Sequence, residues 1–158
     1  MKIQRRYSTT QVEGATVRGV AVPFNSPSKP LRDMPERGTY REIFTRDSIR
    51  EIGDHVALYV GHDPQQVPVA RVGSGTLRFN RTENGLEFEA DISPARTDII
   101  DALKRNDLPG ASIGFRMVQD QWITKSKPAT RMVRAADLYE LSLVVSPAYE
   151  AAQIEGIQ

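Results

Sequence analysis

The stretch D-L-Y-E-L-S-L-V-V at residues 137–145 decides the fold class of this 158-residue chain. Apolar and polar side chains alternate along it, and successive side chains of a β-strand point to opposite faces of a sheet. The alternation therefore predicts a strand over Leu138–Val145. One face carries Leu141, Leu143 and Val145, and the other carries Glu140, Ser142 and Val144.

The same period of two recurs along the chain and is interrupted by Gly, Pro and Asn, which is typical of strands joined by turns. Five further strands are expected, at Thr16–Pro23, Val56–Tyr59, Val69–Leu77, Leu86–Ile92 and Ser112–Val118. The dipeptide Asn84-Gly85 lies between the expected strands Val69–Leu77 and Leu86–Ile92. It suits the positive backbone angles of a tight hairpin turn. We therefore expect a mainly β domain that contains this hairpin.

Two helices are expected beside the strands. A short one is predicted at Asp47–Ile52, and a second at Asp98–Arg105, where Thr97 can cap the first turn. The apolar face of the second helix consists of Ile99, Ile100 and Leu103. The segments Asn25–Gly38 and Thr124–Thr130 are polar with little periodicity, which predicts surface loops.

Composition sets further limits on the fold and function. A length of 158 residues without an internal repeat suits one domain, 1–158. The 21 Lys+Arg and 20 Asp+Glu give a net charge of +1 with no long block of either sign, which argues against a nucleic-acid partner. No apolar run reaches the roughly 18 residues of a membrane helix, so neither a membrane partner nor secretion is indicated.

Several kinds of chemistry lack the residues they need. The chain has no Cys, which excludes disulfides, thiolate metal sites and a cysteine nucleophile. Its two histidines, His55 and His62, show no metal-binding spacing, and no glycine-rich phosphate loop is present. We therefore expect no metal and no cofactor. A hydrolase with paired carboxylates stays open, although nothing singles out a pair.

Three side chains are candidates for chemistry, each with a plainer alternative. His62 follows an apolar strand and precedes a turn with Pro64, where an imidazole is free to act as a base or is simply a surface residue. Ser112 stands between Gly110 and Gly114, which permit a close backbone or ligand approach, but it also suits an ordinary strand residue.

Glu140 is the third candidate, because a carboxylate in so apolar a strand needs a partner. That partner is either His62, which makes Glu140 an orienting group, or an arginine such as Arg131 or Arg134, which makes it structural. The residues alone do not decide between the two.

Four motifs in order resemble the prohead proteases of tailed bacteriophages, which are similar in fold to the herpesvirus assemblins. They are G-V-A-x-P-F at Gly19–Phe24, G-H-D at 61–63, G-x-S-I-G-F at 110–115 and L-x-E-x-S-x-V-x-x-P-A at 138–148. The resemblance covers about residues 15–150. Many members carry a further polar tail, so a trimmed C-terminal extension is an open expectation.

The resemblance implies a serine endopeptidase in which Ser112 is the nucleophile and His62 the general base. The third member in the herpesvirus relatives is a histidine placed after the nucleophile, and this chain has none there. Glu140 lies at the comparable point, with Asp137 and Asp63 as alternatives, and a bare Ser-His dyad stays open.

The resemblance also implies the architecture and setting. It implies a closed or nearly closed antiparallel β-barrel of the herpesvirus-protease type with peripheral helices. The expected substrates are a scaffold protein, the scaffolding segment of the major capsid protein, and the enzyme itself. Portal and other prohead components are further expected partners, together with homo-oligomerisation, and the expected location is the host cytoplasm, inside the phage procapsid. The alternative is an inactive structural or scaffolding protein, or a peptide-binding β-barrel.

Overall fold

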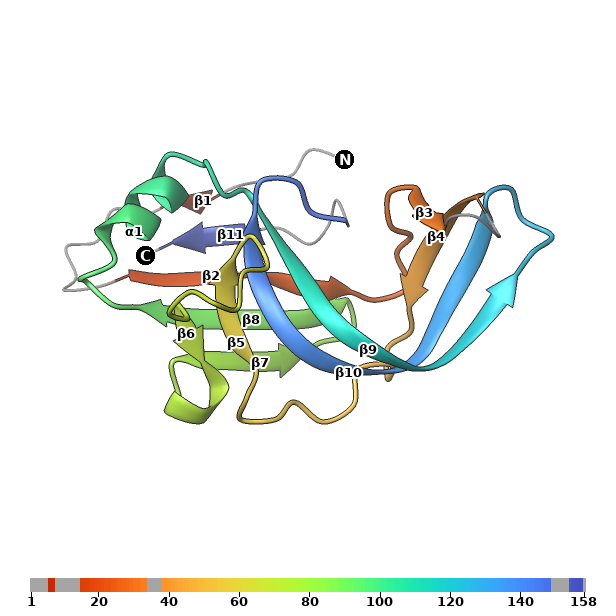
Figure 1. Ribbon diagram of the computed structural model, residues 1–158, viewed down its shortest axis with the longest axis horizontal. Coiled ribbons are helices and arrows are strands. Elements are labelled where there is room, and N and C mark those ends of the chain that lie inside the picture. Colours follow the sequence, from red (N-terminus) through yellow and green to blue (C-terminus); the bar gives the residue numbers. More distant parts are fainter. Residues whose placement is uncertain (1–5, 8–14, 34–37, 149–153, 158) are drawn as a thin grey trace.

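The computed structural model describes residues 6–7, 15–33, 38–148 and 154–157 (Figure 1). One α-helix, α1 (Thr97–Lys104), and a short 3-10 helix, η1 (Val72–Ser74), accompany the strands in this part of the chain. The strands are β1 (Arg6–Tyr7), β2 (Ala15–Pro23), β3 (Leu31–Asp33), β4 (Gly38–Phe44), β5 (Ala57–Val60), β6 (Ala70–Arg71), β7 (Leu77–Arg81), β8 (Gly85–Ile92), β9 (Gly110–Ile123), β10 (Ala129–Val144) and β11 (Ile154–Ile157).

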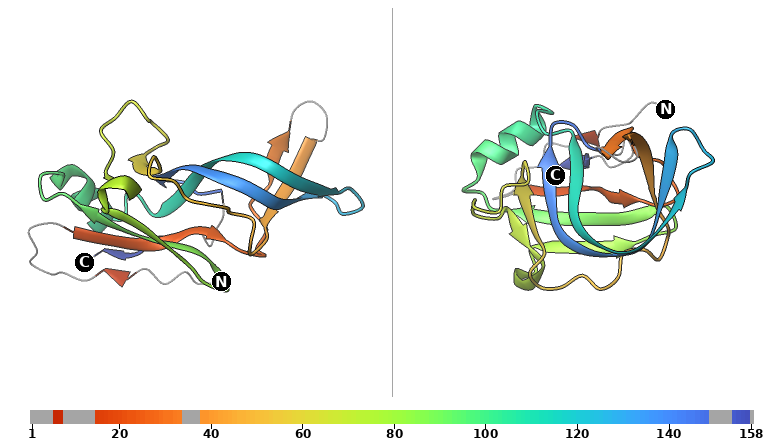
Figure 2. Two further views of the ribbon diagram at one scale, coloured as in Figure 1. Left: turned by 90° about the horizontal axis from the view of Figure 1, so that it is seen from below. Right: turned by 45° about the vertical axis from the view of Figure 1, so that its right-hand side comes forward.

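The strands form two sheets. One has the order β1-β11-β2-β8-β7, and the other has the order β3-β4-β10-β5-β6 with β9 also paired to β10. Figures 1 and 2 show β9 and β10 as a long twisted ribbon that runs from the body of the molecule to the end where β3 and β4 lie. β10 is the organising strand, because β4, β5 and β9 all pair with it.

The expected closed or nearly closed antiparallel β-barrel with several helices is wrong. Within the described residues neither strand order returns to its first strand, so both sheets are open. The pairs β10–β4 and β10–β5 are parallel, and α1 is the one α-helix of the described chain. Alternation indicates which residues are strands and which face they share, but it does not fix the partner, direction or closure of a sheet.

Most of the expected strands are present, several with different bounds. β2, β5 and β8 lie where the alternation placed them, and Ser112–Val118 and Leu138–Val145 are parts of the longer β9 and β10. The expected strand Val69–Leu77 is interrupted, because η1 separates the short β6 from β7. Gly75 ends η1 in the left-handed conformation with φ 74°, which suits glycine and diverts the chain.

The hairpin at Asn84-Gly85 is confirmed, with Arg81 opposite Leu86, but its expected mechanism is wrong. Neither residue of the dipeptide has a positive φ. Thr82 closes the turn instead, since its N–H donates to the Gly85 carbonyl at 2.9 Å and its hydroxyl accepts from the Gly85 N–H at 3.2 Å. Gly85 is needed for space, because a Cβ there would lie 2.6 Å from the Val22 carbonyl oxygen.

The helix expected at Asp98–Arg105 is confirmed as α1, which buries Ile99 and Leu103, although Thr97 is its first residue and makes no capping bond. The helix expected at Asp47–Ile52 is absent from the structure. That segment begins in a turn and then bridges to β10 at Ile49, with the Ala136 N–H donating to the Ser48 carbonyl at 2.7 Å and the Arg50 N–H donating to the Ala136 carbonyl at 3.1 Å. Its backbone groups are used by the sheet and are not available for a helical turn.

The expected loop at Thr124–Thr130 is confirmed for 124–128, whereas Asn25–Gly38 is more ordered than expected. It contains β3, and Ser28 is fully buried, with its hydroxyl accepting from the Glu42 N–H at 2.9 Å. Residues 34–37 of this segment lie outside the described residues.

The hydrophobic core lies between the two sheets and α1. Fully or almost fully buried side chains come from both sheets, for example Val17, Val22, Leu86, Phe88, Phe44, Leu58, Leu141 and Leu143. Phe44 meets Phe115 edge-on, with ring centroids 5.0 Å apart, which is a favourable aromatic geometry. The core fixes β5, β9 and β10 side by side, and these three strands carry the residues of interest.

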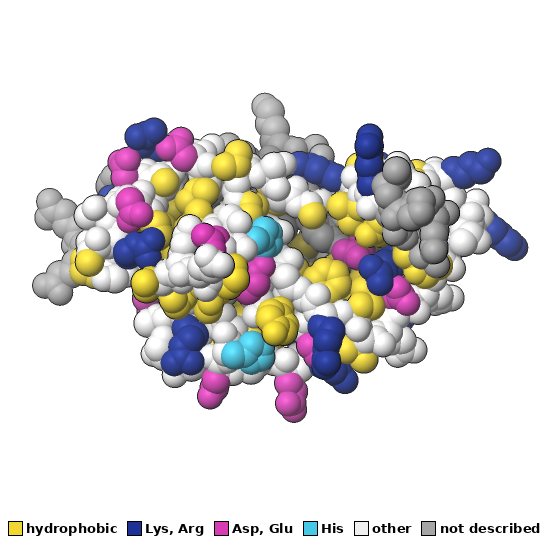
Figure 3. Space-filling view, viewed as in Figure 1, with side chains coloured by type: hydrophobic (Ala, Val, Ile, Leu, Met, Phe, Trp, Pro, Cys, Tyr) yellow, Lys and Arg dark blue, Asp and Glu magenta, His cyan; other side chains and the backbone are white. Residues whose placement is uncertain are grey.

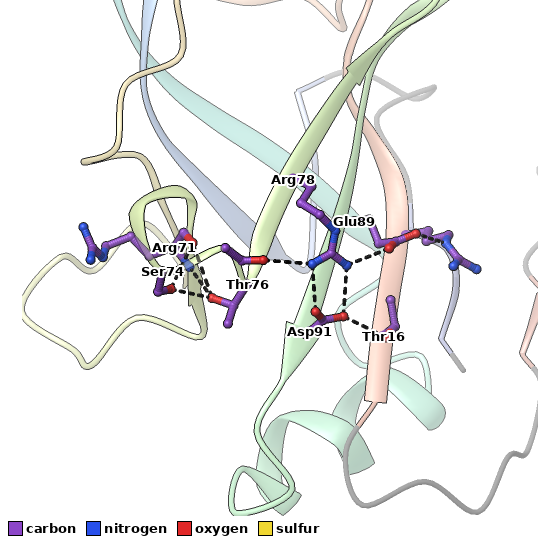
Figure 4. Close-up of polar contacts among 9 residues, drawn as sticks. Thr16, Arg71, Ser74, Thr76, Arg78, Glu89 and Asp91 are labelled. Atoms are coloured by element: carbon purple, nitrogen blue, oxygen red, sulfur yellow. Dashed lines mark hydrogen bonds and ion pairs between the residues drawn. The ribbon is translucent and has the colours of Figure 1, made fainter.

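A network of charges covers the solvent-exposed face of β2, β7 and β8 (Figure 4). Arg78 donates to Glu89 at 2.6 Å and to Asp91 at 2.8 Å, while Arg18 also contacts Glu89 and the Thr16 hydroxyl donates to Asp91 at 3.0 Å. The bonds from Arg78 lower the pKa of both carboxyl groups below their ordinary values, and the bond from Arg18 adds to the effect on Glu89.

Candidate active site

His62 is held by the turn that follows β5. Gly61 and His62 both adopt the left-handed conformation, with φ 65° and 60°. The Gly61 N–H donates to the Leu143 carbonyl at 3.0 Å, and the His62 N–H donates to the Ser142 hydroxyl at 3.1 Å. A left-handed conformation is strained for a residue other than glycine, so these two bonds to β10 hold the imidazole in a defined place.

The Glu140 carboxylate meets the imidazole of His62. Its Oε1 contacts the ring nitrogen Nδ1, and its Oε2 accepts a hydrogen bond from the Ser142 hydroxyl at 2.8 Å. The Glu140 side chain is 16% exposed and that of His62 is 43% exposed, so the contact lies at the rim between core and solvent. Figure 3 shows the surrounding surface, hollowed at its centre, where histidine and acidic side chains lie close together.

This arrangement decides between the two partners considered for Glu140. Arg131 donates to Asp120 at 2.7 Å and lies 3.7 Å from Glu42, and Arg134 donates to Gln121 at 2.9 Å. In the described part of the chain, Glu140 is therefore placed with His62, and the arginines have other partners.

Ser112 lies on β9 directly opposite Ser142 of β10. Residues directly opposite one another in an antiparallel pair project to the same side of the sheet, so Ser112 shares the face of Ser142 and Glu140. Ser112 is half-buried, and its hydroxyl makes no hydrogen bond with another described residue. Its Oγ is therefore not hydrogen-bonded to His62.

A pocket of about 230 Å³ opens beside Ser112. Its other lining residues are Ala21, Leu31, Tyr40, Glu42, Ile113, Phe115, Arg131 and Ala148. Most of these side chains are apolar, and the charged Arg131 and Glu42 face each other. Ser112 is thus one of the residues that line this pocket, whereas His62 and Glu140 do not line it.

The two alternative acidic candidates lie elsewhere. Asp63 accepts bonds from the Gln65 N–H and the Gln66 side chain, both at 3.0 Å, within its own turn. Asp137 bonds to Arg116 and Arg50, and these bonds lower the pKa of its carboxyl group. Neither carboxylate is placed against His62.

His55 and possible metal ligands lie outside this arrangement. The His55 ring packs edge-on against Tyr139, with centroids 5.9 Å apart. Within the ranges that the structure describes, no group of three or more His, Asp or Glu side chains is arranged to hold a metal ion.

Two residues make contacts with the candidate site that the sequence did not predict. Ser142 is fully buried and bonds to both Glu140 and the His62 backbone, and its place on the Glu140 face of the strand was the signal for it. Gly114 lies opposite Glu140, and a Cβ at this position would be 2.7 Å from Glu140 Oε1. The second glycine of G-x-S-I-G-F therefore makes room for the carboxylate.

A serine on β9, a carboxylate on β10 and a histidine in the turn after β5 are the side-chain types that a serine hydrolase uses, and the histidine and the carboxylate are in contact. The chain belongs to the caudovirus prohead serine protease family, whose model matches residues 2–158. Comparisons with curated proteins and with solved structures gave no match. Within its described residues, the chain has no helix long and apolar enough to cross a membrane.

Proposed function

We propose that this chain is a serine endopeptidase in which Ser112 is the nucleophile, His62 the general base and Glu140 the residue that orients the base. The observation that carries this proposal is the contact between Glu140 Oε1 and His62 Nδ1. With Nδ1 taken by the carboxylate, the proton of a neutral imidazole resides there and Nε2 is left as the acceptor.

In the first chemical step the Ser112 hydroxyl attacks the scissile carbonyl carbon while Nε2 of His62 takes its proton. A C–O bond forms, the carbonyl electrons move to the oxygen, and Glu140 stabilises the imidazolium. The imidazolium then protonates the leaving amine as the C–N bond breaks. Water next attacks the acyl-enzyme carbonyl carbon while His62 takes its proton, and the imidazolium returns a proton to Ser112 Oγ as the ester C–O bond breaks.

The proposed substrates are those of prohead maturation: a scaffold protein or the scaffolding segment of the major capsid protein, and the protease chain itself. The family description, caudovirus prohead serine protease, supports this assignment. The proposed place of action is inside the procapsid in the host cytoplasm, with the enzyme working as a homo-oligomer near the portal and other prohead components.

The deciding experiment uses Ser112→Ala, which removes one hydroxyl from the site. The parent should be labelled by a fluorophosphonate, a reaction that joins Ser112 Oγ to phosphorus and releases fluoride, and should shorten a co-expressed capsid precursor. Ser112→Ala should do neither and should keep its melting temperature.

Ser93→Ala is the control, because Ser93 is an exposed serine before α1 whose hydroxyl accepts from the Ala95 N–H at 3.2 Å. It should label and cleave like the parent. Equal labelling and cleavage by Ser112→Ala would reject Ser112 as the nucleophile, and an inert parent would favour a structural protein without activity.

A further inference from the structure

Ser142 is the side chain through which the members of the candidate site are connected. It is fully buried, and its hydroxyl has two partners, the His62 N–H at 3.1 Å and Glu140 Oε2 at 2.8 Å. A buried hydroxyl of this kind cannot itself attack a substrate. Its donor and acceptor capacities are instead both directed at the groups that would activate another serine.

The bond to Glu140 fixes the orientation of the carboxylate. Because Oε2 accepts from Ser142, Oε1 is the oxygen that meets His62 Nδ1. Without the hydroxyl, Oε2 loses its partner and the carboxylate is free to rotate about its terminal torsion, which is broad and soft.

The hydrogen bond from the His62 N–H to the Ser142 hydroxyl holds the backbone of the second partner in the Glu140–His62 contact. His62 is in a left-handed conformation with φ 60°, and its amide would lack this partner if the hydroxyl were removed. The remaining anchor of the turn is the Gly61 N–H, which donates to Leu143. One hydroxyl therefore positions both the backbone of the base and the carboxylate that meets its ring.

The location of Ser142 in the sheet relates this pair to the nucleophile. In register, Ser142 lies opposite Ser112 of β9 on one side and Tyr59 of β5 on the other. β5 leads directly into the turn of His62, so Ser142 lies in the short part of β10 that pairs with both the strand of Ser112 and the strand that precedes His62.

We propose that Ser142 is a positioning residue of the protease, one that aligns the His62 imidazole through Glu140 and through the His62 backbone. This inference rests on the proposed function, because it assigns a task to Ser142 only if His62 acts as the base for Ser112. Glu140 from β10 is the charged group at the imidazole, Asp63 bonds within its own turn, and β9 presents the uncharged Ser112 and Gly114.

The test measures the rate of fluorophosphonate labelling of Ser112 against pH for the parent, Ser142→Ala and Ser142→Cys. We expect both variants to label about tenfold to a hundredfold more slowly, the loss that corresponds to one hydrogen bond to a charged group. The pH midpoint of labelling should also move to lower pH, because a misaligned carboxylate stabilises the imidazolium less. Ser142→Thr keeps the hydroxyl and should restore most of the rate.

The matched control is Ser48→Ala. Ser48 is also fully buried, and its hydroxyl donates to the Thr45 carbonyl at 2.6 Å in the segment that bridges to β10. Its loss should lower the melting temperature without changing the pH midpoint. Ser142→Cys is nearly isosteric and decides the question if Ser142→Ala does not fold.

An unchanged pH midpoint in the Ser142 variants, with or without a slower rate, would overturn the positioning role, since a loss of packing alone is not expected to move the midpoint. A parent chain that is not labelled at Ser112 would instead reject the proposed function. The two failures are therefore distinguishable by mass spectrometry of the labelled parent.

Discussion

The Glu140 carboxylate lies against Nδ1 of His62, and Nε2 of the same ring makes no hydrogen bond with any described residue. The two residues are 78 positions apart in the chain, and β10 and the turn after β5 bring them together. Among the described residues, the ring thus has one nitrogen in contact with a carboxylate and one nitrogen without a hydrogen-bond partner.

Replacing Glu140 by Gln should lower turnover by up to about 10⁴-fold, the scale known for an amide in place of the orienting carboxylate of a triad. The loss should be smaller than that of Ser112→Ala or His62→Ala, because Glu140 itself moves no proton. It should fall on the chemical step, because Glu140 orients the imidazole and stabilises the imidazolium in that step. Single-turnover cleavage and melting temperature are measured on one preparation.

The control for that experiment is Asp137→Asn, which breaks bonds to Arg50 and Arg116 away from His62. It should affect the melting temperature and leave turnover unchanged. Unchanged turnover with a lower melting temperature in Glu140→Gln would reject Glu140 as the third member and favour Asp63, Asp137 or a bare dyad.

Gly114→Ala should reduce the labelling of Ser112 at least about tenfold without unfolding the chain. The added methyl would lie 2.7 Å from Glu140 Oε1, so the carboxylate must move away from His62. A double-mutant cycle with Glu140→Ala checks this mechanism, because residues that act through one contact are not additive. Full additivity of the two changes would show that Gly114 acts by another route.

Gly110→Ala should lower the free energy of unfolding by about 1–3 kcal/mol, the usual cost of overpacking a filled site. A Cβ at Gly110 would lie 2.6 Å from Cγ and Cδ of Pro147, and a proline ring cannot rotate away as a flexible side chain can. Urea denaturation measures the change. Stability equal to that of the parent would mean that Pro147 does not pack against the start of β9 as described.

The Arg78 network should make stability depend on pH in the acid range. The folded pKa values of Glu89 and Asp91 are lowered from 4.5 and 3.8, so their contribution is present above those values and is lost as pH falls through the folded pKa values. The melting temperature should therefore drop below about pH 4.5. The effect should be modest, because these groups are partly exposed and screened by solvent.

Arg78→Gln provides the comparison for this prediction. Removing the guanidinium removes the largest cause of both shifts, so the melting temperature of the variant should fall less steeply with acid than that of the parent. Parallel curves for the two proteins would show that other carboxylates, such as Asp137, dominate acid unfolding.

The sequence predicted the local structure correctly where a residue pattern is compatible with only one kind of secondary structure. The alternation around Glu140 predicted the strand and placed Ser142 on the same face. Of the three residues expected on the apolar face of α1, Ile99 and Leu103 are buried, whereas Ile100 is only partly buried. Closure of the sheets was not predictable, because the same alternation suits an open sheet and a barrel. The segment Asp47–Ile52 was mistaken for a helix because its bridge to Ala136 of β10 is a contact between distant parts of the chain.

The candidate site was predictable as a set of residues and not as a geometry. The motifs selected Ser112, His62 and Glu140, whereas the residues alone left Glu140 equally suited to an arginine. The choice depends on which side chains the sheet register brings together, and nothing local to Glu140 encodes that register. The roles of Ser142 and Gly114 were hidden for the same reason.

The convergence of distant segments on β10 has a consequence for when the protein can act. His62 meets Glu140 and Ser142 across 78 and 80 positions of sequence, and such contacts form only after long loops have closed. A nascent chain that has emerged as far as Ser112 has no β10, hence no carboxylate for the base and no register for the nucleophile. Under the proposed function, the growing polypeptide is therefore expected to stay inert until its last long strand has docked.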